Sequence, residues 1–112
     1  MDKAPATGRP SGFRFDAELD LAEMDDRGRP GPVWTGKGKA ISRSNLIFRS
    51  RRMCYIGRTI LMAVHLIDDK PVALIGTVQA CDYDGDGQYK VDIDLIPMPD
   101  DPEIARWLTA RG

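Results

Sequence analysis

Long apolar runs and clusters of histidine and cysteine are both absent from this sequence of 112 residues. The most apolar stretch, residues 59–67, is too short to span a bilayer and contains His65, so we expect no membrane insertion. The first residues lack the apolar segment of a secretory signal, which predicts a cytoplasmic protein. Cys54 and Cys81 are too far apart for a CxxC motif, which argues against zinc and favours two small buried side chains, with a disulfide left open.

Signatures of catalysis are equally scarce. His65 is the only histidine, and within an apolar stretch a structural role is commoner than that of a base. The sequence has no GxSxG elbow, no P-loop and no GxGxxG motif before a helix. Asp92 and Asp94 alternate with apolar residues, as on the outward face of a strand. We therefore expect a binding protein with no catalytic residue and no cofactor.

Acidic residues are missing from residues 27–67, where nine arginines and lysines occur. These are Arg27, Arg29, Lys37, Lys39, Arg43, Arg49, Arg51, Arg52 and Arg58. The stretch carries a charge of +9 and the two flanks together −10, which gives the net charge of −1. The cations either form a solvated face that pairs with the acidic flanks, or a surface for an anionic ligand, and charge alone leaves both interpretations open.

Alternation of apolar and polar residues is the main structural signal. In residues 13–21 every second residue is apolar, which is typical of a strand with one buried face. We expect further strands at residues 33–41, 46–48, 59–67, 72–80 and 89–95, and turns at residues 25–32, 68–71 and 84–87. Six short strands separated by regular turns predict a mostly β fold, an antiparallel barrel or sandwich.

The two ends of the chain differ from this pattern. Residues 1–12 are rich in proline and glycine and predict a flexible leader, so the domain is expected to span residues 13–112. Asp101 suits the N-cap of a helix, Pro102 its first position and Gly112 its end. Ile104, Trp107 and Leu108 would share one apolar face. We expect one C-terminal helix that packs on the barrel and plugs one end.

Residues 82–87 copy the first half of a calcium-binding loop of the EF-hand kind. The twelfth position of such a loop supplies a bidentate glutamate, and here that position is Ile93. The flanking residues also alternate like strands, whereas the motif requires helices. A hairpin turn rich in aspartate and glycine explains the same residues, so we expect no metal site.

The short polar corner around residues 42–45 joins two expected strands within the acid-free stretch. It offers backbone N–H groups, the Ser42 hydroxyl and the Arg43 guanidinium, all donors suited to an anionic ligand. Asn45 tolerates positive φ and is expected to hold a tight turn there. The alternative is a simple hairpin corner in which Ser42 and Ser44 cap backbone groups.

Six strands, this corner and a terminal helix resemble PilZ domains, small bacterial barrels of which many bind cyclic di-GMP. The family pattern is RxxxR before the first strand and (D/N)xSxxG between the second and third strands. Ser42 matches the serine, Ala40 replaces the acid or amide, and Asn45 replaces the glycine. Arg14 lies at the distance of the second arginine, and Arg9 is one residue beyond the place of the first. The resemblance covers about residues 9–110.

The resemblance implies a PilZ-like six-stranded antiparallel β-barrel that binds cyclic di-GMP and relays the event to a protein partner not identified by the sequence. It implies that the ligand is bound by five residues: Arg9, Arg14, Ser42, Arg43 and Asn45. One alternative is a PilZ-like adaptor that binds protein without nucleotide. A second is a small barrel that uses its basic stretch on nucleic acid, which is disfavoured because only Trp34, Phe48 and Tyr55 are available there for base stacking.

Overall fold

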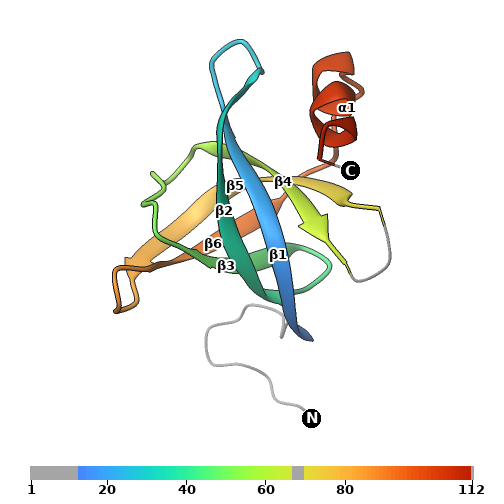
Figure 1. Cartoon of the computed structure of the whole chain (residues 1–112). Helices are drawn as coiled ribbons and strands as arrows, with labels where there is room; N and C mark the ends of the chain where they lie inside the picture. The colour runs from blue at the N-terminus through green and yellow to red at the C-terminus, as the bar shows by residue number, and fades with distance from the viewer. Residues whose placement is uncertain (1–12, 67–69, 112) are drawn as a thin grey trace.

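The six strands close into one antiparallel barrel, in the order β1-β2-β3-β6-β5-β4 (Figure 1). The computed structural model describes residues 13–66 and 70–111. The elements are β1 (Phe13–Met24), β2 (Pro30–Ile41), β3 (Asn45–Ser50), β4 (Thr59–His65), β5 (Val72–Tyr83), β6 (Tyr89–Leu95) and α1 (Pro102–Thr109). This confirms the expected mostly β class, and pairing of β1 with β4 shows that the sheet is a barrel and not a sandwich. Closure gives each strand a partner on both sides over part of its length.

The barrel interior is filled by one face of each strand. The apolar residues that alternate in β1, such as Leu19 and Leu21, are fully buried, as are Phe48 from β3 and Ile93 from β6. This pattern follows from the two-residue period of a strand, because every second side chain points to the same face. Most polar residues of the same strands therefore remain on the outer surface, whereas Asn45 and Ser50 of β3 are buried.

Several strands run further than the sequence predicted. β2 begins at Pro30 and includes Pro32, within the expected turn, and β5 continues to Tyr83. Pairing with one neighbouring strand, β1 for the start of β2 and β6 for the end of β5, overrides the weak strand preference of these residues. Residues 68 and 69 of the turn expected after β4, and the leader expected at residues 1–12, lie outside the described residues.

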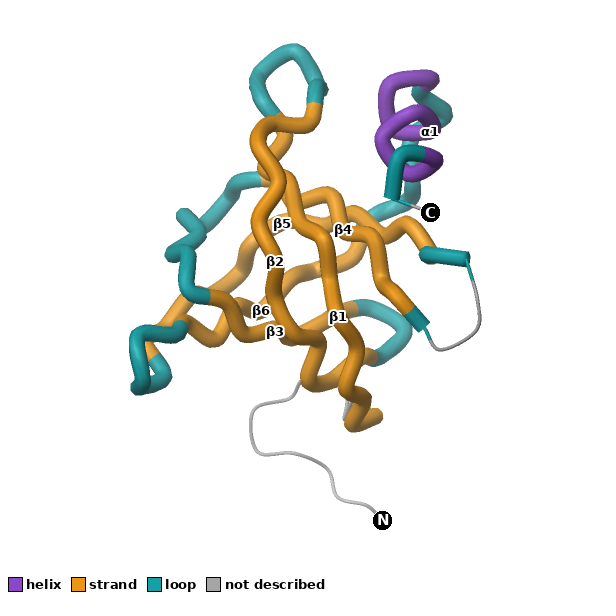
Figure 2. The backbone as a smooth tube through the Cα atoms, in the orientation of Figure 1, coloured by secondary structure: helices purple, strands orange, loops and turns teal. Residues whose placement is uncertain are grey.

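Helix α1 packs on the outer face of the barrel and does not plug an end (Figure 2). Its buried residue Ile104 forms a second, smaller core with Met24, Leu61 and Ile75, and Trp107 packs against this cluster. The expected N-cap is confirmed, because the Asp101 side chain accepts a hydrogen bond from the N–H of Glu103 at 2.9 Å. Leu61 is apolar on the outward face of β4, which leaves a patch that the helix must cover.

Residues 84–87 form the hairpin turn that joins β5 to β6. Gly85, Asp86 and Gly87 all have positive φ, at 87°, 56° and 72°. The N–H of Asp84 donates to the carbonyl oxygen of Gln88 at 2.8 Å, and Gln88 donates back to Gly85 at 2.9 Å. The residues that copy half a calcium loop are thus a hairpin between two strands, as the alternation of their flanks indicates.

Candidate ligand-binding site

The β2–β3 corner, residues 42–45, is closed by the Ser42 side chain. Its hydroxyl oxygen accepts hydrogen bonds from the N–H groups of Asn45 and Ser44 at 3.1 and 3.3 Å. The same hydroxyl donates to the side-chain oxygen of Asn45, and the N–H of Ser42 donates to the Asn45 carbonyl oxygen at 2.8 Å. Ser42 therefore caps backbone groups, which was the simpler of the two interpretations of its role.

Asn45 does not have the conformation that the sequence predicted. It is the first residue of β3, and among the described residues the non-glycine residue with positive φ is Asp86. Its side chain is buried and donates to Asp92 of β6 at 3.3 Å. Asn45 therefore holds the corner against the next strand through its amide, because a buried amide must find partners, and not through a left-handed backbone.

The remaining predicted site residues are distributed around this corner. Arg43 is exposed and makes no ion pair with any described residue. Arg14 pairs in register with Ala40, so its backbone lies beside the end of β2 that leads into the corner. Arg9 falls outside the described residues. The structure thus brings Arg14, Ser42, Arg43 and Asn45 to one end of the barrel.

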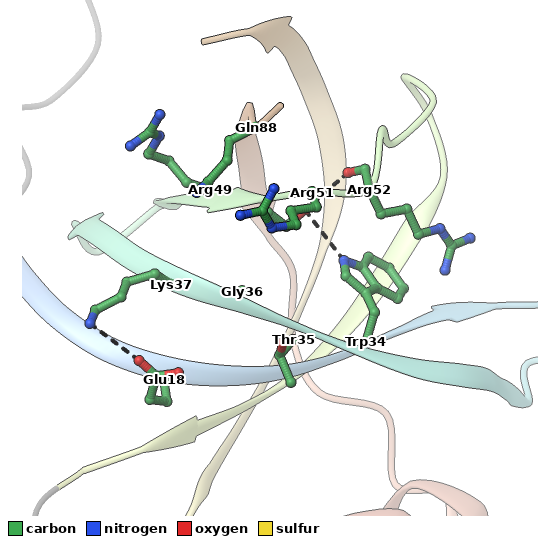
Figure 3. A pocket seen from close by; sticks show the side chains of 10 residues that line it. Glu18, Trp34, Thr35, Gly36, Lys37, Arg49, Arg51, Arg52 and Gln88 are labelled. Carbon is green, nitrogen blue, oxygen red and sulfur yellow. Dashed lines mark hydrogen bonds and ion pairs between the residues drawn. The ribbon is translucent and has the colours of Figure 1, made fainter. Parts of the chain in front are cut away.

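A second surface, missed by the sequence analysis, is an open groove of about 420 Å³ over β2 and β3 (Figure 3). We call it the basic groove. Its lining residues are Glu18, Trp34, Thr35, Gly36, Lys37, Arg49, Ser50, Arg51, Arg52 and Gln88. Lys37 and Arg49 form a register pair on neighbouring strands, with both side chains on the outer surface. The acid-free stretch was the available signal, but pairing across the corner was needed to gather these cations.

The Trp34 indole forms one wall of the basic groove. The Arg52 guanidinium lies 4.0 Å from the centre of the indole ring, and the indole N–H donates to Ser50 at 3.4 Å. Arg52 is held there by Glu23 of β1, at 3.2 Å, and Glu23 also binds Arg58 at 2.7 Å. The indole face is therefore already occupied by a cation.

The two cysteines contact each other, and His65 contacts a carboxylate on the neighbouring strand. Cys54 is buried, Cys81 is half-buried, and both are free thiols, with the N–H of Cys54 donating to the sulfur of Cys81 at 3.3 Å. Burial, and then the neighbouring Cys81, raise the pKa of the Cys54 thiol to about 12. His65 lies 3.1 Å from an Asp20 carboxylate oxygen on the neighbouring strand. Among the described residues, no three His, Cys, Asp or Glu side chains gather as a metal ion requires.

Comparison with known proteins adds no assignment, since neither a family model nor a curated protein matches this chain. In the described part of the chain, no helix has the length and apolar character needed to cross a membrane.

Proposed function

We propose that this barrel is a PilZ-like signalling module that binds cyclic di-GMP at the β2–β3 corner and relays the event to a protein partner. The observation that carries the proposal is the register pair of Arg14 with Ala40, because it brings a strand-borne arginine next to the corner. Arg43 adds an exposed cation without an ion-pair partner among the described residues. Two arginines whose backbones lie at or beside one polar corner suit a ligand with two phosphates and two planar bases.

The hydrogen bonds of the corner indicate which residues shape it and which would contact the ligand. Ser42 and Asn45 use their side chains on each other and on the backbone, so their contribution to binding is the shape of the corner. Arg14 and Arg43 would contact the ligand, through bidentate hydrogen bonds to phosphate and stacking on guanine. Ala40 lacks the acid or amide of the family pattern. A missing charge-assisted hydrogen bond is worth about 1.5–3 kcal/mol, so the proposed affinity is about ten- to a hundredfold below that of an intact motif.

A relay to a protein partner requires accessible apolar surface. The loop between β3 and β4 offers it, because Met53, Tyr55 and Ile56 are 43%, 65% and 71% exposed. This loop is anchored to β5, since the N–H of Gly57 donates to the Val78 carbonyl oxygen at 2.9 Å. Exposed apolar side chains on an anchored loop support a role in protein contact.

Isothermal titration of cyclic di-GMP into the purified protein, with GTP as the control nucleotide, tests the proposal. We expect saturable heat with cyclic di-GMP alone, and a loss of about tenfold or more in affinity for Arg14→Gln and for Arg43→Gln. Arg27→Gln is the matched control, because Arg27 is an exposed arginine on the β1–β2 turn at the opposite end of β2 (Figure 1). Absence of heat from a folded sample would contradict the proposal and favour the adaptor that binds protein without nucleotide.

A further inference from the structure

The basic groove is separate from the corner to which the proposed function assigns cyclic di-GMP. Arg49 follows Asn45 by four residues along β3, which is about 13 Å at the rise of a strand. No corner residue lines the groove. A ligand of the groove is therefore independent of the proposed function, and either can be tested without the other.

The cations of the groove differ in how firmly their charge is already neutralised. Arg49 binds Asp84 at 2.8 Å, and Arg52 is fixed between Glu23 and the indole of Trp34. Lys37 binds Glu18 at 3.2 Å, but both side chains are about half or more exposed, and such a pair contributes little. Arg51 is exposed and makes no ion pair with a described residue. Lys37 and Arg51 are therefore the cations available to an anionic ligand.

The shape of the groove favours a chain over a small molecule. Pockets for small ligands enclose most of the ligand surface, whereas this groove is open to solvent. Its cations do not converge on one point: Lys37 stands on β2 on one side, and Arg49 and Arg51 stand on or just after β3 on the other (Figure 3). Cations spread along an open groove match a polymer with repeated negative charges.

The aromatic residues of the region exclude base stacking as the source of affinity. Arg52 covers the indole face of Trp34, and Phe48 is fully buried in the barrel. Tyr55 is exposed but does not line the groove. Aromatic stacking is therefore not the source of affinity here, and the charge of the ligand is what the groove recognises.

We propose that the basic groove binds the phosphate backbone of single-stranded nucleic acid, without sequence preference. Lys37 and Arg51 would each neutralise a phosphate, and Thr35 and Gln88 add polar groups to the walls. Lys37 must leave Glu18 to do so, and removal of the Glu18 charge should therefore strengthen binding.

Fluorescence anisotropy of a labelled oligothymidine of about twelve nucleotides, at low salt, tests this proposal. Two neutralised phosphates predict that log K falls with log salt with a slope of about −1.4. We expect Arg51→Gln to weaken binding about tenfold and Glu18→Gln to strengthen it a few-fold, about the range for one charged contact. Arg43→Gln and Asp16→Asn are the matched controls, since Arg43 lies at the corner and Asp16 pairs with Lys39 outside the groove at 3.4 Å.

Three outcomes would overturn the proposal. One is absence of binding at low salt by a protein shown to be folded. A second is equal weakening in Arg51→Gln and Arg43→Gln, which would indicate attraction to overall charge and not to the groove. The third is equal affinity for thymidine monophosphate and for the oligomer, which would indicate a free-nucleotide site. Cyclic di-GMP binding that depends on Arg43 but not on Arg51 would leave this proposal unaffected.

Discussion

Ser42 and Asn45 form two hydrogen bonds with each other across the β2–β3 corner. The Ser42 hydroxyl donates to the Asn45 side chain and accepts from the Asn45 N–H at 3.1 Å. Asn45 extends the same network to Asp92 of β6 at 3.3 Å. One hydroxyl thus links the end of β2 to the start of β3 and, through Asn45, to the next strand. This network stabilises the corner because the polar side chains of Ser42 and Asn45 both have partners in it.

Ser42→Ala should lower the free energy of unfolding by about 1–2 kcal/mol, because it leaves buried polar groups of Asn45 without their partner. Urea unfolding followed by tryptophan fluorescence measures the change. Ser42→Thr retains the hydroxyl and is the control, expected near the wild-type stability. Equal stability of the alanine variant and the wild type would show that the corner does not depend on this hydroxyl.

Gly76→Ala should be among the most damaging substitutions in the barrel. A Cβ at Gly76 would lie 2.3 Å from the Ile93 side chain and 2.4 Å from the Asp94 carbonyl oxygen, so the backbone of β6 would have to move. We expect a loss of about 3 kcal/mol or more, at the upper end for overpacking. Thermal unfolding measures it.

Gly38→Ala is the comparison for Gly76→Ala. A Cβ at Gly38 would also clash, at 2.5 Å, but with the end of the half-exposed Phe15 ring, which is able to rotate away. The expected loss is therefore smaller, about 1 kcal/mol. A larger loss for Gly38→Ala than for Gly76→Ala would contradict this account of the two contacts.

The Cys54 thiol predicts how stability depends on alkaline pH. Its pKa is raised from 9.0 to about 12 in the folded protein, so the unfolded chain releases this proton first as the pH rises. The stabilising contribution is complete below pH 9.0 and is lost between 9.0 and about 12. The slope is at most about 1.4 kcal/mol per pH unit. Cys54→Ala should show a shallower decline in that range, measured by urea unfolding, and an identical decline would contradict the prediction.

Among the described residues, Glu23 is the one carboxylate that holds two arginines: Arg52 of the basic groove at 3.2 Å, and Arg58, which lies outside the groove, at 2.7 Å. Glu23→Gln should lower the free energy of unfolding by about 1–2 kcal/mol. The Glu23 side chain is only 21% exposed, and loss of its charge leaves two cations unpaired. Released from Glu23, Arg52 should also change the fluorescence of Trp34. Glu18→Gln, which breaks a well-exposed pair with Lys37, should cost under about 0.5 kcal/mol. Similar losses in both variants would contradict the difference in burial.

Local patterns in the sequence determined the elements of this protein. Alternation of apolar and polar residues predicted β1 and β6, because a strand presents every second side chain to the same face, and short apolar or β-branched runs between turn residues predicted the other four strands. The start of helix α1 followed from Asp101 and Pro102, whose preference depends on the backbone groups of the first helical turn. The basic character of β2, β3 and the loop after them could also be read directly from residues 27–67.

Tertiary structure decided how these elements combine. Closure of β1 on β4, the position of α1 against Leu61, and the gathering of Lys37, Arg49 and Arg51 around one groove all depend on contacts between residues far apart in the chain. A period of two in the sequence indicates which face of a strand is buried but not which strand lies beside it. Register therefore decided that the basic residues form a groove, because only pairing across the corner brings Lys37 opposite Arg49.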